Sequence, residues 1–328
     1  MNIKIVVSYL EGIAPPSLQE SYDNSGLIVG DATKECTGVI VCLDSTEDVI
    51  DEAIAKGCNV VVAHHPIVFS GLKSFTGKNY IEKTIIKAIK HDVAIYAIHT
   101  NLDNVKHGVN GVWASALGLK NKKILAPKKG LLKKLVVFVP QSDKDNVLQA
   151  MFDAGAGKIS NNADYSLSSV GKGTIKPLEN ANPYIGDIGK LKSEEESRVE
   201  VMVESFQVGN VLSAMKKSHP YEEAAYDLID LQSSHAEIGA GMIGDLPDSV
   251  DAISWMKSMK ETMKCGVVRY TPIHKMNVKK VAICGGSGSF LLSDAIRQGA
   301  DIFVTADFKY HQFFDAENKI IIADIGHY

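Results

Sequence analysis

The sequence lacks several features that would each mark a particular class of protein. No apolar run in its 328 residues approaches the roughly 18 residues of a transmembrane helix, and the N-terminus, MNIKIVVSYLEG, has no small-residue cleavage site. The formal net charge is only −4, which gives no electrostatic reason to expect nucleic acid or an anionic membrane surface as a partner. We therefore expect a soluble protein.

Cysteine is also scarce, and its distribution argues against a disulfide framework and against a metal site built from cysteine. The five cysteines are odd in number and scattered, and no two of them form a C-x-x-C pair. This pattern favours buried, reduced thiols over a disulfide framework, and it favours a cytoplasmic location. Any metal ligands in this chain are therefore expected to be nitrogen and oxygen atoms, which suit Zn, Mn, Fe, Co or Ni.

Both ends of the chain alternate between apolar strands and amphipathic helices. The predicted strands are residues 39–44, 60–66, 93–103, 279–286, 301–307 and 319–327. The predicted helices are residues 46–57, 79–92 and 290–299. Because the strands are apolar without alternation, we expect parallel sheets that are covered on both faces, and therefore an α/β fold.

The middle of the chain follows a different order. Strands are predicted over 134–140, 164–170, 198–205 and 225–231, with helices over 143–155 and 207–219. Strand–helix–strand–strand–helix–strand is the ferredoxin-like order of a self-contained α+β domain. We therefore predict three parts: an N-terminal α/β lobe over 1–130, an inserted domain over 131–231, and a C-terminal α/β lobe over 232–328 that completes the core.

Four predicted strands of the outer lobes end in polar residues of metal-binding type. They are HH at 64–65, HTNLD at 99–103, AD at 306–307 and GH at 326–327. Ligands of open α/β sheets bind beyond the carboxyl ends of the strands, so these groups should converge. Asp103 would share a face with His99 if the strand continued, whereas the adjacent His64 and His65 would point to two different places. That spacing suits two metal ions with a carboxylate such as Asp103 between them.

The alternative is that these histidines have structural roles. A single histidine at a strand end is more often a hydrogen-bonded surface residue than a ligand. His311 follows the IFVTAD strand and fits either group. The histidines away from strand ends are expected to be structural: His91, His107, His219, His235 and His274.

Two glycine-containing motifs are candidates for substrate contact. GGSGS at 285–289 lies between a strand and a helix, so Gly286 and Ser287 could hold an anion on backbone N–H groups, although a tight packing turn explains the glycines equally well. DNSGL at 23–27 could present Asp23 and Asn24 to a ligand, but the same residues are common in ordinary turns.

Several linked motifs resemble the Nif-three-like family, also called the GTP cyclohydrolase I type 2 family, across nearly the whole chain. The matching stretches are SYDNSGLIVG (21–30), VVAHHPIVFSGLKS (61–74), AIHTNLDNVKHGVN (97–110), AICGGSGS (282–289), ADFKYHQFFDA (306–316) and ADIGHY (323–328). The insert resembles the PII-signal-protein-like domain of longer family members through NANPYIG (180–186) and HPYEEAAYD (219–227). Tyr22 and Ala306 depart from the family pattern, which commonly has Trp and Gly there.

The resemblance implies a dinuclear metal site, with zinc as the first choice of metal. His64 and His65 would bind separate ions, Asp103 would be the bridging carboxylate, and His327 would be a further ligand. The family pattern continues to a glutamate ligand four positions after that histidine, and this chain stops before it, at Tyr328. The resemblance also implies a homo-oligomer, a hexamer built from dimers.

Three functions fit these observations. The first is a metal-dependent hydrolase acting on a nucleotide, nominally like a GTP cyclohydrolase, with His99 or His311 transferring protons. The second is a metal-dependent phosphatase or phosphodiesterase acting on a related phosphorylated substrate. The third is a regulatory or scaffold protein in which the metals are structural and the PII-like insert senses a small molecule.

Overall fold

The computed structural model describes residues 1–158, 162–180, 184 and 186–327. The chain divides into two compact units, one formed by residues 1–126 with 237–328 and the other by residues 127–236. The insert was predicted over 131–231. Parts of two resemblance motifs, residues 181–183 and 185 of NANPYIG and residue 328 of GHY, lie outside the described residues.

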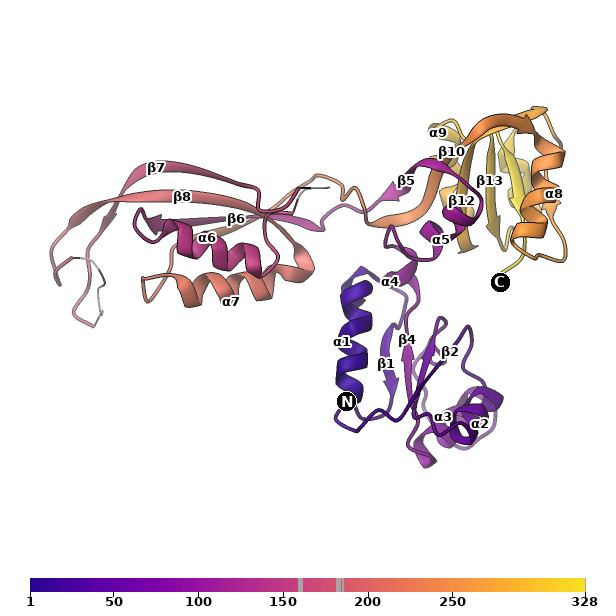
Figure 1. The fold of residues 1–328 in the computed structure, drawn as a ribbon, viewed down its shortest axis with the longest axis horizontal. Helices are drawn as coiled ribbons and strands as arrows, with labels where there is room; N and C mark the ends of the chain where they lie inside the picture. The colour runs from indigo at the N-terminus through magenta and orange to yellow at the C-terminus, as the bar shows by residue number, and fades with distance from the viewer. Residues whose placement is uncertain (159–161, 181–183, 185, 328) are drawn as a thin grey trace. The chain divides into compact units, whose positions relative to one another are not determined.

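The first sheet of the larger unit is built from the N-terminal part of the chain (Figure 1). Its strands are β1 (Gly26–Val29), β2 (Val39–Cys42), β3 (Val60–Ala63) and β4 (Ala94–Ala97), in the order β1-β4-β3-β2. Strands β2, β3 and β4 are parallel, and β1 is antiparallel to β4. The sheet matches the predicted parallel core, with one antiparallel edge strand added.

Helices cover both faces of this sheet, as the unbroken apolar strands predict. They are α1 (Ile3–Ile13), the short η1 (Pro16–Leu18), α2 (Glu47–Ala55) and α3 (Tyr80–Lys90). On one face, Ile50 of α2 and Ile85 of α3 pack with Val61 and Ile95. On the other, Ile3 and the half-buried Leu10 of α1 pack in a cluster with strand residues that include Val60.

The prediction of a strand over 93–103 was wrong at its C-terminal end. Strand β4 ends at Ala97, and a short helix, α4 (Thr100–Asp103), follows. The cause is local. The N–H of His99 donates to Asn101 Oδ1 at 2.9 Å, and the N–H of Asp103 donates to the His99 carbonyl at 3.1 Å. These bonds turn the chain into a helix, so the shared-face argument for His99 and Asp103 does not apply.

The second sheet of the larger unit has the strand order β11-β14-β13-β12-β10-β5. Its strands are β5 (Lys120–Pro127), β10 (Gly239–Asp251), β11 (Arg269–Tyr270), β12 (Asn277–Ser287), β13 (Ile302–Ala306) and β14 (Ile321–Asp324). The helices are α5 (Val109–Ala116), α8 (Ala252–Thr262), η3 (Ser289–Leu291), α9 (Leu292–Arg297) and η4 (Tyr310–Ala316). Strands β12, β13 and β14 are parallel, so their carboxyl ends share one edge.

The smaller unit has the predicted strand–helix–strand–strand–helix–strand order. Its elements are β6 (Leu132–Pro140), α6 (Lys144–Asp153), β7 (Ser166–Ile175), β8 (Lys192–Glu204), η2 (Ser205–Gln207), α7 (Val208–Ser218) and β9 (Tyr226–Asp230). The antiparallel sheet order β7-β8-β6-β9 is the ferredoxin-like arrangement. Helices α6 and α7 lie on one side of this sheet, where Met151 and Met215 pack with Val137 and Val201 (Figure 1).

Two expectations from composition can be compared with the structure. All five cysteines are free, with Cys265 and Cys284 buried. Within the described ranges, the helices are all too short or too polar to cross a bilayer. The fold is therefore a mixed α/β fold with several sheets, and the strands whose ends carry the candidate site all belong to the larger unit.

Candidate metal centre

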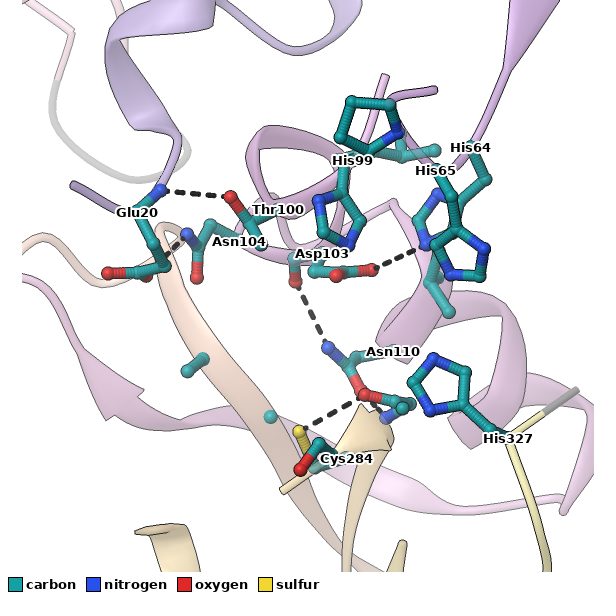
Figure 2. Close-up of a pocket in the computed structure, with 18 of the residues that line it drawn as sticks. Glu20, His64, His65, His99, Thr100, Asp103, Asn104, Asn110, Cys284 and His327 are labelled. Carbon is teal, nitrogen blue, oxygen red and sulfur yellow. Dashed lines mark hydrogen bonds and ion pairs between the residues drawn. The ribbon is translucent and has the colours of Figure 1, made fainter. Parts of the chain in front are cut away.

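A pocket of about 750 Å³ lies in the larger unit, at the carboxyl ends of strands from both of its sheets. Most of the predicted site residues line it: His64, His65, His99, Asp103, Gly286, Ser287 and His327. The first sheet supplies the residues that follow β3 and β4, and the second supplies those at the ends of β12 and β14 (Figure 2). The convergence expected from the strand ends is therefore present in the structure.

Three histidines form a compact group in the pocket wall. One ligand atom from each of His64, His65 and His99 lies within 4.8 Å of the others. The ring centroid of His327 is 5.4 Å from that of His65, which places it beside the group. Imidazole nitrogens this close together are typical of a metal-binding site.

The adjacent His64 and His65 face the same pocket, although strand alternation predicts opposite directions. Their ring centroids are 5.0 Å apart. The reason is that β3 ends at Ala63. The N–H groups of His64 and His65 then donate to two successive carbonyls, those of Cys42 and Leu43, at 3.1 and 3.0 Å. In a regular strand, only every second residue donates its N–H group to a given neighbouring strand. Bonds from two successive N–H groups therefore mean that the chain bends here, and both rings turn to one side.

Each of the four histidines has its Nδ1 atom bound to an oxygen. His64 Nδ1 is 2.9 Å from the Ile98 carbonyl oxygen. The other three Nδ1 atoms bond to carboxylates: His65 to Asp44 at 2.8 Å, His99 to Asp23 at 2.7 Å, and His327 to Asp307. Because these oxygens only accept, each Nδ1 atom carries a proton, and in the neutral form of the ring the lone pair lies on Nε2. A carboxylate or carbonyl behind the imidazole is the usual environment of a metal-binding histidine.

Asp103 is the last residue of α4, and its Oδ1 atom lies 3.8 Å from His64 Nε2. In the described part of the chain, no hydrogen-bond donor contacts this carboxylate. Burial, assisted by Asp23, raises the pKa of Asp103 to about 7, against the opposing effect of His99 and His327. A half-buried carboxylate without a hydrogen-bond donor, facing the Nε2 atom of His64, fits a metal ligand.

The electrostatics of His64 fit the same role. Burial, together with the neighbouring His99 and His65, lowers the pKa of His64 to about 4. The ring is therefore neutral at physiological pH, the protonation state in which imidazole binds a metal.

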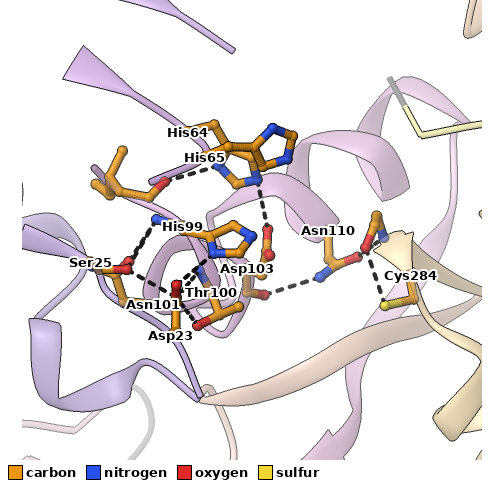
Figure 3. A network of polar contacts seen from close by, with 12 residues as sticks. Asp23, Ser25, His64, His65, His99, Thr100, Asn101, Asp103, Asn110 and Cys284 are labelled. Atoms are coloured by element: carbon orange, nitrogen blue, oxygen red, sulfur yellow. Dashed lines mark hydrogen bonds and ion pairs between the residues drawn. The ribbon is translucent and has the colours of Figure 1, made fainter. Parts of the chain in front are cut away.

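Asp23 lies behind His99 and does not line the pocket. Its side chain is fully buried and bonds to His99, to the N–H and hydroxyl of Thr100, and to the Ser25 hydroxyl (Figure 3). Burial alone would raise the pKa of Asp23, but hydrogen bonds from His99 and Thr100 outweigh it and hold this pKa well below its usual range. Asp23 therefore orients His99 and starts α4.

Two other candidates also lie away from the pocket wall. Asn24 donates to the Val68 carbonyl at 2.7 Å, which ties the DNSGL turn to the segment after the two histidines. His311 is on η4, exposed, with its ring centroid 5.1 Å from that of Tyr310. Neither is among the residues that line the pocket.

Glycines of the GGSGS segment permit close packing at the second sheet. A Cβ atom on Gly285 would lie 2.9 Å from Val109, and one on Gly288 would clash with the Thr305 hydroxyl. Gly286 has a φ of +65°, and a Cβ atom there would be 3.5 Å from the His327 ring. These contacts support the packing interpretation of the motif, while Gly286 and Ser287 still line the pocket.

Sequence reasoning missed the role of Asp44, and it flagged Asp307 only as part of a strand-end pattern. Asp44 is the last residue of the predicted strand 39–44, so its position was visible, but a single carboxylate at a strand end gives no signal until the distance to His65 is known. Asn110 was also missed. Its buried side chain donates to the Asp103 carbonyl at 3.0 Å and accepts from the Gly285 N–H at 2.9 Å.

Comparison with known proteins agrees with this architecture. The sequence profile of the Duf34/NIF3 (NGG1p interacting factor 3) family matches residues 1–328. The chain belongs to the DUF34/NIF3 family. A relative from Halalkalibacterium halodurans, named "GTP cyclohydrolase 1 type 2 homolog", is 42% identical over 99% of this chain and 88% of its own length.

Solved structures of DUF34/NIF3 proteins have the same fold. A Bacillus cereus protein related to NIF3 is 39% identical, with a TM-score of 0.89 over 100% of this chain and 88% of that chain. Staphylococcus aureus protein SA1388 is 30% identical, with a TM-score of 0.76 over 100% of this chain and 87% of its own. The predicted family resemblance is thereby confirmed.

Proposed function

We propose that the pocket binds two divalent metal ions, zinc most readily, and that this DUF34/NIF3 protein is a metal-dependent hydrolase. One observation carries the proposal. Four imidazoles have their Nδ1 atoms fixed by oxygen atoms, and they surround a pocket that also contains a carboxylate without a hydrogen-bond donor among the described residues. Nitrogen and oxygen donors of this kind suit zinc and related divalent ions.

His64, His65, Asp103 and His327 are the proposed ligands, and the geometry adds His99. Its position in the compact group with His64 and His65 favours a ligand role over the proton-transfer role that the sequence suggested. Asp23, which bonds to His99 Nδ1, supports this ligand role of His99. A carboxylate on Nδ1 orients the ring and increases the basicity of Nε2, the atom that would bind the metal.

Paired divalent cations supply hydroxide at neutral pH and polarise a substrate oxygen. The chain's own residues prepare the site for them. Asp44, Asp23 and Asp307 fix three imidazole rings, so the ligand atoms need little reorganisation on binding. Asp103 adds negative charge to the pocket and thereby offsets the charge of the cations.

The name of the relatives supplies a first substrate class to test. "GTP cyclohydrolase 1 type 2 homolog" points to a nucleotide, or a related phosphorylated compound, as the substrate whose bond is hydrolysed. We further propose that residues 127–236 form a PII-like insert and that the chain assembles into a homo-oligomer, a hexamer by resemblance.

Metal analysis combined with a hydrolysis panel tests the proposal. The purified protein should contain two divalent ions per chain and hydrolyse at least one member of a panel of nucleotides, nucleosides and bases. Asp103→Asn should lose at least one ion and all activity while keeping the fold, because a neutral side chain cannot balance two cations. Asp48→Asn, at an exposed position on α2, is the matched control and should change neither property. An unchanged metal content in Asp103→Asn would contradict the assignment.

A further inference from the structure

Asp324, the last residue of β14, is a buried carboxylate that does not line the pocket. Only 2% of its surface is exposed. It pairs in register with Thr305 of the parallel strand β13 and with Arg269 of the antiparallel strand β11. A carboxylate this deeply buried needs hydrogen-bond donors for its charge. Two of its donors come from the segments that carry Asp307 and His327.

These two donors are backbone N–H groups from different turns. Asp324 Oδ2 accepts from the Phe308 N–H at 2.9 Å, in the segment after β13, and Oδ1 accepts from the Gly326 N–H at 3.1 Å, in the segment after β14. Asp307 directly precedes the first donor, and His327 directly follows the second. One carboxylate therefore joins the two segments whose side chains form the Asp307–His327 pair.

Both turns contain a backbone conformation that needs support. Asp307 has a φ of +58°, in the left-handed region that residues other than glycine rarely adopt, and Gly326 has a φ of +87°. The bonds to Asp324 come from the residue after Asp307 and from Gly326 itself. Without this acceptor, we expect both turns to relax and the Asp307 carboxylate to leave its place beside the His327 ring.

Arg269 fixes the Asp324 carboxylate in turn. Its Nη2 atom donates to Asp324 Oδ2 at 2.5 Å. The guanidinium carbon lies 5.7 Å from the centroid of the Phe313 ring, and that ring packs against the buried Phe308 with centroids 5.4 Å apart. An arginine that is both stacked on a ring and bonded to a carboxylate has little freedom to move. The acceptor that joins the two turns is therefore itself held in place.

From these contacts we infer that Asp324 is a positioning residue, which holds the turns of Asp307 and His327 together so that the His327 ring presents Nε2 to the pocket. Its hydrogen bonds reach the backbone of the two turns, so its effect on the ring is indirect. The inference rests on the proposed function where it concerns metal, because His327 is a proposed ligand. The state of the ring can also be measured without metal.

Nuclear magnetic resonance of the metal-free protein tests the position of the ring. At mildly alkaline pH, where free imidazole is neutral, long-range proton–nitrogen correlations show which ring nitrogen carries the proton. His327 should be the Nδ1–H tautomer in the wild type, because Asp307 accepts that proton. Asp324→Asn puts an amide donor against one of the two backbone N–H groups, so the turns should separate and the single tautomer should be lost. The spectrum of His327→Ala identifies the signal.

Zinc affinity, measured by competition with a chelator, provides the second readout. Asp324→Asn should weaken the binding of one of the two proposed ions about 10- to 100-fold, the usual effect of losing a group that orients a metal ligand. His327→Ala should weaken the same ion, and the double variant should bind zinc no more weakly than His327→Ala, because Asp324 acts through that ring. A residue needed only for stability would lower the free energy of unfolding equally in both backgrounds and leave zinc affinity unchanged.

Arg269→Gln provides a second variant in case Asp324→Asn does not fold. The Arg269 side chain is 57% exposed, so this change removes the ion pair with little loss of packing, and it should weaken zinc binding several-fold. Arg297→Gln is the matched control. It removes the ion pair of an exposed arginine with Asp294 on α9, and neither residue lines the pocket. The control should change neither the tautomer of His327 nor zinc affinity.

The outcomes separate this inference from the proposed function. The inference is wrong if Asp324→Asn keeps the wild-type tautomer of His327, or keeps wild-type affinity for both zinc ions, even where metal content and hydrolysis stand. If Asp324→Asn does not fold, the same two results in Arg269→Gln overturn it. If the Nδ1–H tautomer is present in the wild type and lost in the variant, but the wild type binds no zinc, the positioning role holds and the metal proposal fails.

Discussion

Asn110 and Gly285 are hydrogen-bonded partners although 175 positions separate them in the sequence. Asn110 Oδ1 accepts from the Gly285 N–H at 2.9 Å, and Nδ2 of the same side chain donates to the Asp103 carbonyl at 3.0 Å. One buried amide therefore joins α5, the end of β12 and the last residue of α4. The two sheets of the larger unit are tied together at the place where the candidate ligands meet.

Replacing Asn110 should therefore affect both stability and the metal site. Asn110→Ala removes the partner of two half-buried backbone groups, the Gly285 N–H and the Asp103 carbonyl, and we expect it to lower the free energy of unfolding by about 1–3 kcal/mol. Urea unfolding measures this directly. Asn146→Ala, at an exposed position on α6, should stay within about 0.5 kcal/mol of wild type. Equal stability of the two variants would show that the amide bridge contributes nothing.

The carboxylates behind the histidines provide a second prediction. Asp44→Asn and Asp307→Asn each remove the charge that orients an imidazole and increases its basicity. Metal affinity should fall about 10- to 100-fold in each variant, while metal stoichiometry at saturating zinc stays at the wild-type value. Competition with a chelator of known affinity measures the change, with Asp48→Asn as the control. An unchanged affinity in both variants would mean that these pairs are structural only.

His99→Ala separates the two roles considered for this histidine. As a ligand beside His64 and His65, His99 should contribute to metal retention, so the variant should lose metal as well as activity. As a proton-transfer group, it would lower the rate and leave metal content unchanged. Metal stoichiometry after extensive dialysis decides between them. His311→Ala, at an exposed position on η4, should change neither quantity.

Much of this site could be predicted from sequence because the relevant signals are local. His64, His65 and His327 each closely follow an apolar run, and the ends of parallel strands share an edge. The local fold of the His99 segment could not be predicted, since α4 forms through hydrogen bonds that involve Asp23, far away in sequence. Strand β10 was also missed. Its glycines, proline and aspartates give a weak pattern, and its pairing with β12 holds it in the sheet.

Glu82 provides a prediction about pH. Its buried carboxylate accepts hydrogen bonds from the N–H groups of Thr76 and Lys78 at 2.9 and 3.2 Å and from the Thr76 hydroxyl at 3.1 Å. These bonds, the Thr76 N–H first, lower the pKa of Glu82 from 4.5 to about 2. Because the folded pKa is depressed, the stabilisation is fully present above pH 4.5 and disappears as the pH falls towards 2.

Glu82→Gln should therefore be less stable than wild type at pH 7, and the difference should shrink as the pH falls from 4.5 towards 2. Urea unfolding of metal-free protein at several pH values measures the difference without interference from metal release. Glu261→Gln, at an exposed position on α8, should show no such convergence. A difference that stays constant with pH would argue against the hydrogen-bonding role of the Glu82 charge.

The last prediction concerns removal of the insert. All residues that line the pocket belong to 1–126 and 237–328, and residues 127–236 have their own apolar core around Met151 and Met215. The two ends of the insert are close together, because the His235 N–H donates to the Lys128 carbonyl at 2.8 Å. Replacing residues 129–234 with a short Gly-Ser linker should therefore leave the larger unit folded and its metal content unchanged. Asp103→Asn in this deletion variant should lose metal as it does in the full chain. A deletion variant with native-like circular dichroism and cooperative unfolding, but without bound metal, would show that the insert contributes to the site.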